Sequence, residues 1–328
     1  MSCIACRSHK VYPVEKIIVD EFFTKLSIER NFDVNDVQSL KRDLEKYYEI
    51  YHCDSCGLEF ANPMRGGNSD FYELIYRYMP RTGIRWEFTE LQNDFKRRGS
   101  LLDIGCGDGS FVKYAQERGF IARGIDFNTT RVDIGKASNI NLDIINVNEL
   151  NHYLSSKEKF SIFTLWHVLE HLENPDKTLM AIRENSKQGA VLALSVPSDR
   201  FYLTHRSGNA ILNYPPHHLT RWTELSLKKI GEQCGWIMAG VKYEPLDGAL
   251  RIYGQRIVKS LLINHNFLEE LKILMAKRKF SEKLLSPRND AYLNNVTVKV
   301  LGRILYYILL LDKQNFSGMS MYAKFKRS

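Results

Sequence analysis

The spacing of hydrophobic positions changes at about residue 100. From there to residue 243, short apolar runs typical of buried strands alternate with stretches that have the spacing of amphipathic helices. The predicted strands are 101–104, 121–126, 142–147, 160–166, 190–196 and 236–243, and the predicted helices begin near residues 110, 131, 175 and 223. Strands alternating with helices predict a parallel sheet covered on both faces, the doubly wound α/β class.

The C-terminal end predicts one more strand. Between residues 318 and 327, Met319, Met321 and Phe325 alternate with polar residues, which is the period of a strand. We expect it to be the seventh strand of the sheet, with 248–315 as a helical insertion before it. That insertion is basic ahead of an apolar stretch. Residues 270–311 could therefore lie on an anionic membrane, form a homodimer contact or cap the sheet.

Two cysteine pairs mark the N-terminal part of the chain, Cys3 with Cys6 and Cys53 with Cys56. Two thiolates with this spacing occupy one side of a tetrahedral zinc ion, and two such pairs complete it. The pairs lie further apart than the usual ~15–20 residues, so an amphipathic helix predicted at 35–50 would loop out between them. We predict a structural zinc. Reduced thiols without metal and a redox dithiol are the alternatives.

The first 98 residues divide into two predicted parts. Residues 1–65 form the cysteine lobe, which is expected to contribute little to the core. Residues 66–98 form a helical linker or lid with a glycine hinge at its start, and Pro80 and Gly83 break it. Its aromatic residues are candidates for one wall of an acceptor pocket or for core positions: Phe71, Tyr72, Tyr76 and Tyr78. Residues 99–328 are the main domain.

Composition excludes several protein classes. The chain has 328 residues, 44% of them hydrophobic and 26% charged, which excludes a disordered tail protein and a coiled coil as the main body. Six cysteines are too few for a disulfide scaffold of this size. The net charge of +8 is weak support for a nucleic-acid or lipid partner. Residues 1–10 lack the apolar segment of a signal peptide, and Arg303 interrupts the longest apolar run, so we expect a cytoplasmic protein without a transmembrane segment.

A glycine-rich loop follows the first predicted strand. Gly105, Gly107 and Gly109 allow a tight turn whose backbone N–H groups can approach a ligand closely. Asp126 ends the second strand, about 20 residues beyond Asp103, where an acid can hold ribose hydroxyls. The glycine spacing differs from that of dinucleotide binders, and a carboxylate at 103 suits an amino-bearing ligand better than a pyrophosphate. A tight turn without a ligand is the alternative.

Three segments carry a resemblance to a known family. Leu101–Ser110 and Gly124–Asn128 resemble the first two motifs of class I S-adenosylmethionine-dependent methyltransferases, and Phe160–Leu172 resembles their fourth-strand motif. Ser161 departs from the pattern, because the family usually carries Asp there. Tyr51–Pro63 resembles the second knuckle of a zinc ribbon, with which many bacterial members begin. The resemblance implies a Rossmann-like seven-stranded sheet, with S-adenosylmethionine as cofactor and S-adenosylhomocysteine as product.

The resemblance also assigns residues to the cofactor. They lie in the glycine loop and at the carboxyl ends of the following strands: Asp103, Gly105, Cys106, Gly107, Gly109, Asp126, Phe127, Asn148 and Trp166. Asp103 would help hold the amino group and Asp126 the ribose hydroxyls. Phe127 would stack near the adenine. Cys106 is expected to fill space rather than to react.

Histidines follow the fourth and fifth strands, which should bring them to one edge of the sheet. In one interpretation, His167, His217 or His218 is the general base that takes the acceptor proton. In another, Glu170, His171 and His218 bind a divalent cation that acidifies the acceptor, as in some O-methyltransferases that this sequence resembles. In a third, Glu170 and His171 are structural.

The resulting prediction is an S-adenosylmethionine-dependent methyltransferase. The expected acceptor is a hydroxyl on a sugar or glycan precursor, and the expected pathway is polysaccharide biosynthesis. RNA and a quinone-like or lipid-linked small molecule are alternative acceptors, and a non-catalytic cofactor-binding scaffold is an alternative of another class. Nucleic acid is the less favoured partner, because residues 1–65 have no dense basic run with aromatic residues between its charges.

Overall fold

A computed structural model describes residues 1–30, 40, 44–78, 83–95, 98–157, 159–200, 211–245 and 320–328. The chain divides into two compact units, of which the first comprises Met1–Asp199, Ile211–Glu244 and Ser320–Ser328. The second, Arg200–Ala210 with Pro245–Met319, falls almost wholly outside the described residues. The predicted insertion at 248–315, with its membrane or dimer surface at 270–311, therefore lies there as well. None of the described helices is long and apolar enough to cross a membrane.

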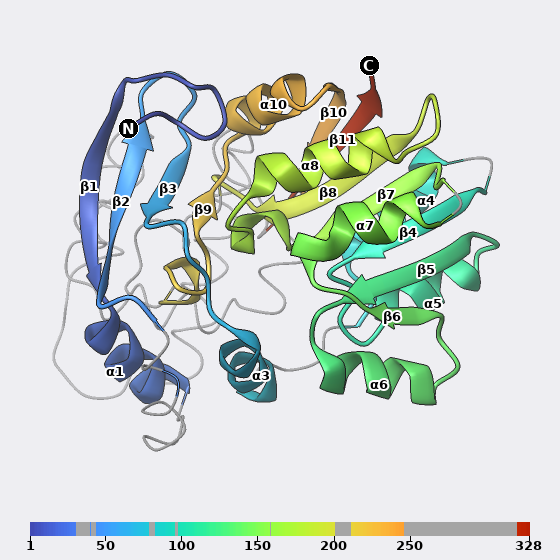
Figure 1. Cartoon of the computed structure of the whole chain (residues 1–328), viewed down its shortest axis with the longest axis horizontal. Coiled ribbons are helices and arrows are strands. Elements are labelled where there is room, and N and C mark those ends of the chain that lie inside the picture. The colour runs from blue at the N-terminus through green and yellow to red at the C-terminus, as the bar shows by residue number, and fades with distance from the viewer. Residues whose placement is uncertain are drawn as a thin grey trace, which may run out of the picture. The chain divides into compact units, whose positions relative to one another are not determined.

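The first unit is built on a seven-stranded sheet (Figure 1). Its strands, in spatial order, are β10 (Trp236–Tyr243), β11 (Ser320–Arg327), β8 (Val191–Pro197), β7 (Ile162–Trp166), β4 (Ser100–Ile104), β5 (Ile121–Asp126) and β6 (Leu142–Ile144). All pairs from β8 to β6 are parallel, whereas β11 runs antiparallel to both of its neighbours. This confirms the predicted doubly wound, Rossmann-like α/β sheet. It also confirms the terminal strand, which the alternation of apolar and polar residues predicted.

Helices cover both faces of the sheet. On one side lie α4 (Trp86–Asp94), α5 (Ser110–Gln116) and α6 (Thr129–Ala137), and on the other α7 (Leu150–Ser155), α8 (Pro175–Glu184) and α10 (Glu224–Gln233). Adjacent strand residues alternate between the two cores: Leu101 packs with the first helices and Leu102 with the second. Both faces of these strands are therefore buried.

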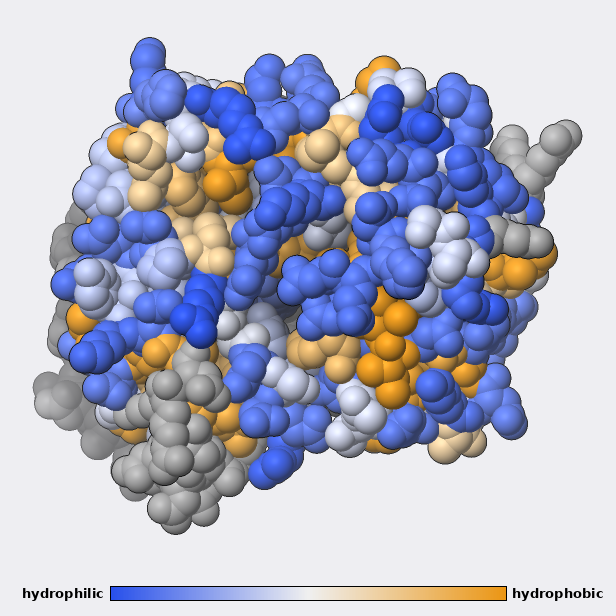
Figure 2. All heavy atoms as spheres, viewed as in Figure 1, coloured by the Kyte–Doolittle hydropathy of each residue, from blue (hydrophilic) through white to orange (hydrophobic). Residues whose placement is uncertain are grey.

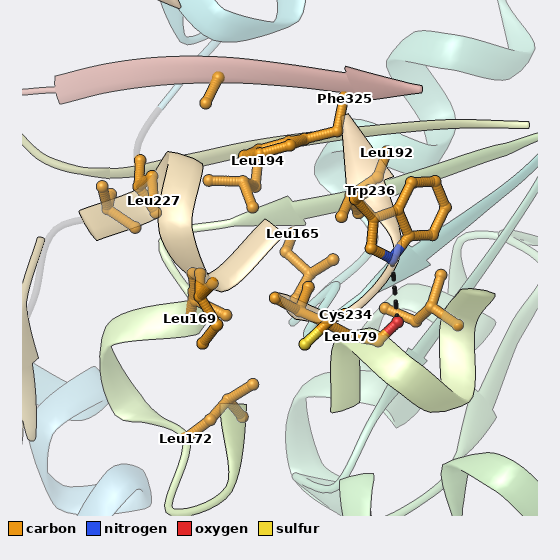
Figure 3. Packing of buried hydrophobic residues seen from close by; sticks show 14 of the residues in the cluster. Leu165, Leu169, Leu172, Leu179, Leu192, Leu194, Leu227, Cys234, Trp236 and Phe325 are labelled. Atoms are coloured by element: carbon orange, nitrogen blue, oxygen red, sulfur yellow. Dashed lines mark hydrogen bonds between the residues drawn. The ribbon is translucent and has the colours of Figure 1, made fainter. Parts of the chain in front are cut away.

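The core under α8 and α10 is packed with leucines (Figure 3). Leu165, Leu192 and Leu194 come from the central strands and meet Leu179 of α8 and Leu227 of α10. The indole N–H of Trp236 donates to the Leu179 carbonyl at 3.0 Å, so this buried polar group has a partner. The face in Figure 2 is mostly hydrophilic, with apolar residues in scattered patches.

A second, four-stranded sheet forms the N-terminal lobe. Its order is β1 (Val11–Ile18), β2 (Tyr47–Cys53), β3 (Glu59–Asn62) and β9 (Thr220–Arg221), and α1 (Val19–Arg30) follows β1. The hydrophobic pattern did not predict β1 or α1. The helix predicted at 35–50 is wrong from Tyr47 on, where the chain forms β2, and most of its remainder lies outside the described residues. β9 follows β8 of the main sheet in the sequence but pairs with β3 of the lobe sheet.

The prediction that the lobe contributes little to the core is wrong. Phe22, Phe23 and Tyr48 are fully buried with Phe71 of α3 (Ser69–Tyr78) in a core of their own. Six further lobe residues belong to the same core as the leucines of Figure 3: Cys3, Ala5, Cys53, Cys56, Leu58 and Phe60. The lobe and the seven-stranded sheet therefore share buried surface. The segment predicted as helical at 66–98 contains two helices, α3 and α4, on either side of Pro80 and Gly83 as expected.

Candidate active site

The loop after β4 turns in the left-handed region of backbone conformation. Gly105, Gly107 and Gly109 have φ angles of 74°, 56° and 77°. A Cβ atom at Gly105 would lie 2.4 Å from Cγ2 of Val168, so a larger residue would clash as well as strain the backbone. The Gly105 N–H donates to the Ile125 carbonyl at 2.8 Å, which ties the loop to β5.

Asp126 closes this loop from the end of β5. Its Oδ2 accepts from the Gly107 N–H at 2.8 Å and its Oδ1 from the Asn128 N–H at 2.9 Å. The side chain is buried, and burial raises its pKa. Both oxygens are thus held in place next to the glycine loop. This is the position at which the sequence predicted contact with ribose.

Asp103 is a second buried carboxyl group at this edge. Its Oδ1 accepts from the Thr164 hydroxyl at 2.7 Å. Burial, together with the charge of Asp126, raises its pKa to about 8. Asp103 is therefore mostly protonated at neutral pH, and a cationic ligand would favour its ionisation.

Helix α3 of the N-terminal half packs beside this edge. The ring of Tyr72 meets that of Phe127 edge-on at 5.6 Å, and Glu73 accepts from the Asn128 amide at 3.2 Å. Tyr72 also lies at a ring distance of 5.6 Å from His171. Tyr72 therefore joins the predicted adenine region to the histidines. Phe71, which was also predicted to line the acceptor pocket, is buried in the core with Phe22 and Phe23.

The other predicted cofactor residues have different surroundings. Asn148 is exposed on the short turn η2 (Val147–Glu149) after β6. Cys106 packs against Gly124, and burial raises the pKa of its thiol, so it is a neutral packing group. The Trp166 ring packs between Phe111 and Tyr322 in the core, and this packing does not support the predicted cofactor contact.

His167 sits between two buried carboxylates. It follows β7 with φ of 54°, unusual for a residue with a side chain. Its Nε2 lies 3.0 Å from Oε1 of Glu87 on α4, and its Nδ1 lies 3.3 Å from Oε1 of Glu170. Burial lowers the pKa of His167, but the two carboxylates outweigh it and raise the pKa to about 9. A protonated imidazole cannot accept a proton, which speaks against His167 as the base.

Sequence reasoning did not identify Glu87 as a partner of His167. It lies in an aromatic-rich helix before the first strand of the main sheet, and nothing in its spacing relates it to residue 167. Only the packing of α4 against the sheet brings the two side chains together.

Three other histidines form a cluster near His167 and its two carboxylate partners. His171 belongs to the turn η3 (Leu169–His171), and His217 with His218 follows η4 (Ile211–Asn213). One ring nitrogen from each lies within 4.8 Å of the others. The prediction that the two motifs meet at one edge is confirmed. The predicted cation site consisted of Glu170, His171 and His218, whereas the observed cluster contains His217 in place of Glu170. Oε1 of Glu170 lies 4.0 Å from Nε2 of His171.

An oxygen atom faces Nδ1 of each histidine in this cluster. Nδ1 of His171 donates to the His217 carbonyl at 2.6 Å, Nδ1 of His217 to the Leu212 carbonyl at 2.7 Å, and Nδ1 of His218 to Oδ1 of Asn213 at 3.0 Å. In a neutral ring this leaves the lone pair on Nε2. Burial lowers the pKa of His171, and burial with the neighbouring histidines lowers that of His218 further. Both are therefore neutral at pH 7.

This cluster has the features of a metal site. Neutral imidazoles whose Nδ1–H groups are bound to oxygen atoms are the usual ligands of divalent transition metals. Glu170 is fully buried beside them, and neither of its oxygens has a hydrogen-bond partner among the described residues. His167 already lies 3.3 Å from Oε1 of Glu170 as an ion-pair partner, and a cation at the cluster would add a second positive charge beside this carboxylate.

The four paired cysteines meet in the N-terminal lobe. Cys3 Sγ lies 3.6 Å from Cys56 Sγ, and Cys6 Sγ lies 3.6 Å from Cys53 Sγ. These distances are too long for a disulfide and close to the separation of about 3.8 Å expected for sulfurs bound to one tetrahedral zinc. All four thiols are free, and their ligand atoms lie within 4.8 Å of one another. The residues thus fit a four-sulfur zinc site.

Residues 77–238 match a family model described as "Methyltransferase domain". The matched segment is similar to this family and makes up just under half of the chain. The matched segment contains the glycine loop, both aspartates and all four histidines described above. The match ends inside β10. It begins at residue 77, so the first three strands of the N-terminal lobe lie outside it.

Curated relatives resemble this chain at low identity. The ubiquinone biosynthesis O-methyltransferase of Saccharophagus degradans is 28% identical over 99 residues, which cover 29% of this chain and 42% of that protein. The enzyme of the same name from Coxiella burnetii is 22% identical over 182 residues, covering 50% and 75%. This chain thus spans less than half of the first relative. A solved SAM dependent methyltransferase from Archaeoglobus fulgidus is 18% identical, with a TM-score of 0.45 over 80% of this chain and 95% of that one.

Proposed function

We propose that this protein transfers the methyl group of S-adenosylmethionine to an oxygen atom of a small acceptor. The observation that carries the proposal is the glycine loop, whose three left-handed glycines close on Asp126 inside a matched methyltransferase domain. When bound, the cofactor supplies a methyl group on a positively charged sulfur. Transfer of this methyl group would convert the cofactor to S-adenosylhomocysteine and methylate the acceptor oxygen. The proton of the acceptor hydroxyl must then be taken up by the protein.

The residues of the edge have distinct parts in this proposal. Asp103 binds the amino group of the cofactor, Asp126 binds the ribose, and Phe127 lies along the adenine. Alignment of the reacting atoms supplies much of the rate, since methyl transfer proceeds in line. His218 takes the acceptor proton, because its imidazole is neutral at pH 7 and lies at the same edge. His217 is the alternative base.

The acceptor we favour is a hydroxyl on an aromatic, quinone-like ring. The names of the curated relatives support this choice, and so do the rings of Tyr72 and the histidine cluster, which suit a planar apolar acceptor. The predicted sugar or glycan acceptor has no support from these relatives and stays a prediction, as does RNA. The fit of the cluster also supports an alternative to the general base. A divalent cation held by His171, His217 and His218 would acidify the hydroxyl, and Nε2 of His218 would then bind the cation instead of taking the proton.

The four-cysteine lobe completes the proposal. We place a structural zinc at Cys3, Cys6, Cys53 and Cys56, which puts the chain in the methyltransferase subgroup with an N-terminal zinc-ribbon-like lobe. A zinc with four sulfur ligands has no open position for a substrate. The role of this zinc is therefore structural, because it ties the segment at Cys3 and Cys6 to the one at Cys53 and Cys56 within the lobe.

Transfer of labelled methyl tests the proposed activity. We expect purified full-length protein to label a catechol-type phenol in preference to sugar nucleotides or RNA. Replacing His218 by glutamine should lower kcat about 10²- to 10⁴-fold, the usual contribution of a general base. The control is His152→Gln, an exposed histidine on α7. Label only in sugar nucleotides would restore the glycan prediction. Tight cofactor binding without any transfer would favour the scaffold.

Cofactor binding should depend on pH through Asp103. Because the pKa of this buried carboxyl is raised to about 8, it must lose a proton when it binds the cationic amino group. We expect the affinity for S-adenosylmethionine to fall by up to about tenfold per pH unit below pH 7. Titration calorimetry at pH 6, 7 and 8 in buffers of different ionisation enthalpy should detect the released proton. Asp103→Asn should remove it, and an unchanged release in this variant would exclude Asp103 as its source.

A further inference from the structure

β9 connects the histidine cluster to the cysteine lobe through the backbone. Leu219, next to His218, accepts from the Ala61 N–H of the lobe at 2.8 Å and donates its own N–H to the Glu170 carbonyl at 2.8 Å. One residue thus bridges the lobe sheet and the turn that carries His171. The following residues Thr220 and Arg221 pair with Phe60 and Glu59 of β3.

Side chains make a second, parallel connection. Nη1 of Arg221 donates to Oε2 of Glu59 at 2.7 Å, and Nε of the same guanidinium donates to the Asn213 carbonyl at 3.0 Å. Its Cζ also lies 4.4 Å from the centre of the Tyr214 ring. The guanidinium is largely buried, with 13% of the side chain exposed. Arg221 therefore fixes the 213–214 turn to a strand that begins three residues after Cys56.

Asn213 connects this turn to His218, the proposed general base. Its buried amide oxygen accepts from Nδ1 of His218 at 3.0 Å, which selects the tautomer with the lone pair on Nε2. Histidine function depends on such partners, because they set both the orientation of the ring and the position of its proton. The contacts run in order from Glu59 to Arg221, Asn213 and His218.

We propose that Arg221 is a positioning residue for His218, and that Glu59 of the cysteine lobe holds Arg221 in place. The lobe then acts on the reaction from a distance, by setting the tautomer and direction of one imidazole. This inference rests on the role proposed above for His218. Lysine could not replace Arg221, since a single ammonium cannot bind Glu59 and the Asn213 carbonyl in the two directions of the guanidinium fork.

Histidine NMR on the full-length protein tests the proposal without requiring turnover. Long-range proton–nitrogen spectra of ¹⁵N-histidine-labelled protein distinguish the two neutral tautomers, and the His218 signals are those lost in His218→Gln. We expect the Nδ1–H tautomer in the wild type and a mixture in Arg221→Gln, Arg221→Lys and Glu59→Gln. The matched control is Arg7→Gln, because Arg7 forms another ion pair between lobe and domain, with Asp176 at 3.0 Å.

Kinetics and cofactor binding provide the second readout. The Arg221 and Glu59 variants should lower kcat about 10- to 100-fold, the usual effect of losing an orienting partner, and leave the affinity for S-adenosylmethionine unchanged. Glu59→Gln keeps the test open if Arg221→Gln does not fold. An unchanged His218 tautomer in the Glu59 and Arg221 variants, or full activity in Arg221→Lys, would overturn the proposal. Absence of methyl transfer by the wild type would count against the proposed function, while the NMR result still decides this one.

Discussion

Replacing Cys56 by serine should destabilise the protein by more than about 4 kcal/mol and lower its melting temperature by about 10 °C. Cys56 is buried in the core that the lobe shares with the seven-stranded sheet. A serine hydroxyl is a poor zinc ligand. The variant would lose the metal as well as a buried sulfur, and metal binding supplies much of the folding energy of small four-cysteine units.

Cys234→Ser is the matched control for this experiment. Cys234 is buried in the same core but lies outside the four-cysteine cluster, and its thiol donates to the Asp176 carbonyl at 3.5 Å. Calorimetry should show a loss of only about 1–2 kcal/mol there. Metal analysis should find about one zinc per chain in the wild type and in Cys234→Ser, and almost none in Cys56→Ser. Equal losses of stability, with no zinc in any of the three proteins, would mean that the cysteines only fill the core.

Glu170→Gln is expected to cost about 3–5 kcal/mol, because it leaves the partly buried imidazolium of His167 with one carboxylate instead of two. The folded protein raises the pKa of His167 from 6.5 to about 9. The resulting stabilisation, about 3 kcal/mol, is complete below pH 6.5 and disappears as the pH rises through 9. The wild type should therefore lose stability between pH 7 and 9.5, and the variant should lose less.

A double variant separates charge pairing from packing. His167→Gln combined with Glu170→Gln removes both charges, so it should be more stable than Glu170→Gln alone. Urea unfolding at pH 7 of the wild type, the two single variants and the double variant gives the coupling energy. A coupling energy near zero would show that His167 and Glu170 act independently, and that the ion pair contributes little.

The doubly wound sheet was predictable because its signals are local. Most strands of the main sheet are short apolar runs. In the terminal strand, apolar and polar residues alternate, and this local pattern is visible although the strand is far in sequence from its partner β8. β1 gave no such signal because it is an edge strand. Its residues are mostly exposed on both sides, so neither an apolar run nor a clean alternation marks it.

The candidate site was predictable only in part, for a related reason. The glycine loop and the histidines stand at the ends of strands, and the topology brings such ends to one edge. Partners from distant elements carry no such mark. Glu87 reaches His167 only through the packing of α4, and Glu59 reaches Arg221 only because β9 joins the lobe sheet. Charge states were equally hidden: His167 and His218 look alike in the sequence and differ in protonation because of these neighbours.

The pairing of β3 with β9 also has a consequence for biosynthesis. A chain leaving the ribosome presents β1, β2 and β3 early, but the last strand of their sheet is only made some 158 residues after Asn62. At typical elongation rates this interval is roughly 8–30 s, during which the outer side of β3 and the apolar residues behind it have no native partner. The nascent lobe is thus exposed to aggregation or chaperone binding until its closing strand is synthesised. Early binding of zinc by the four cysteines, all of which precede residue 57, would stabilise the rest of the lobe during that interval.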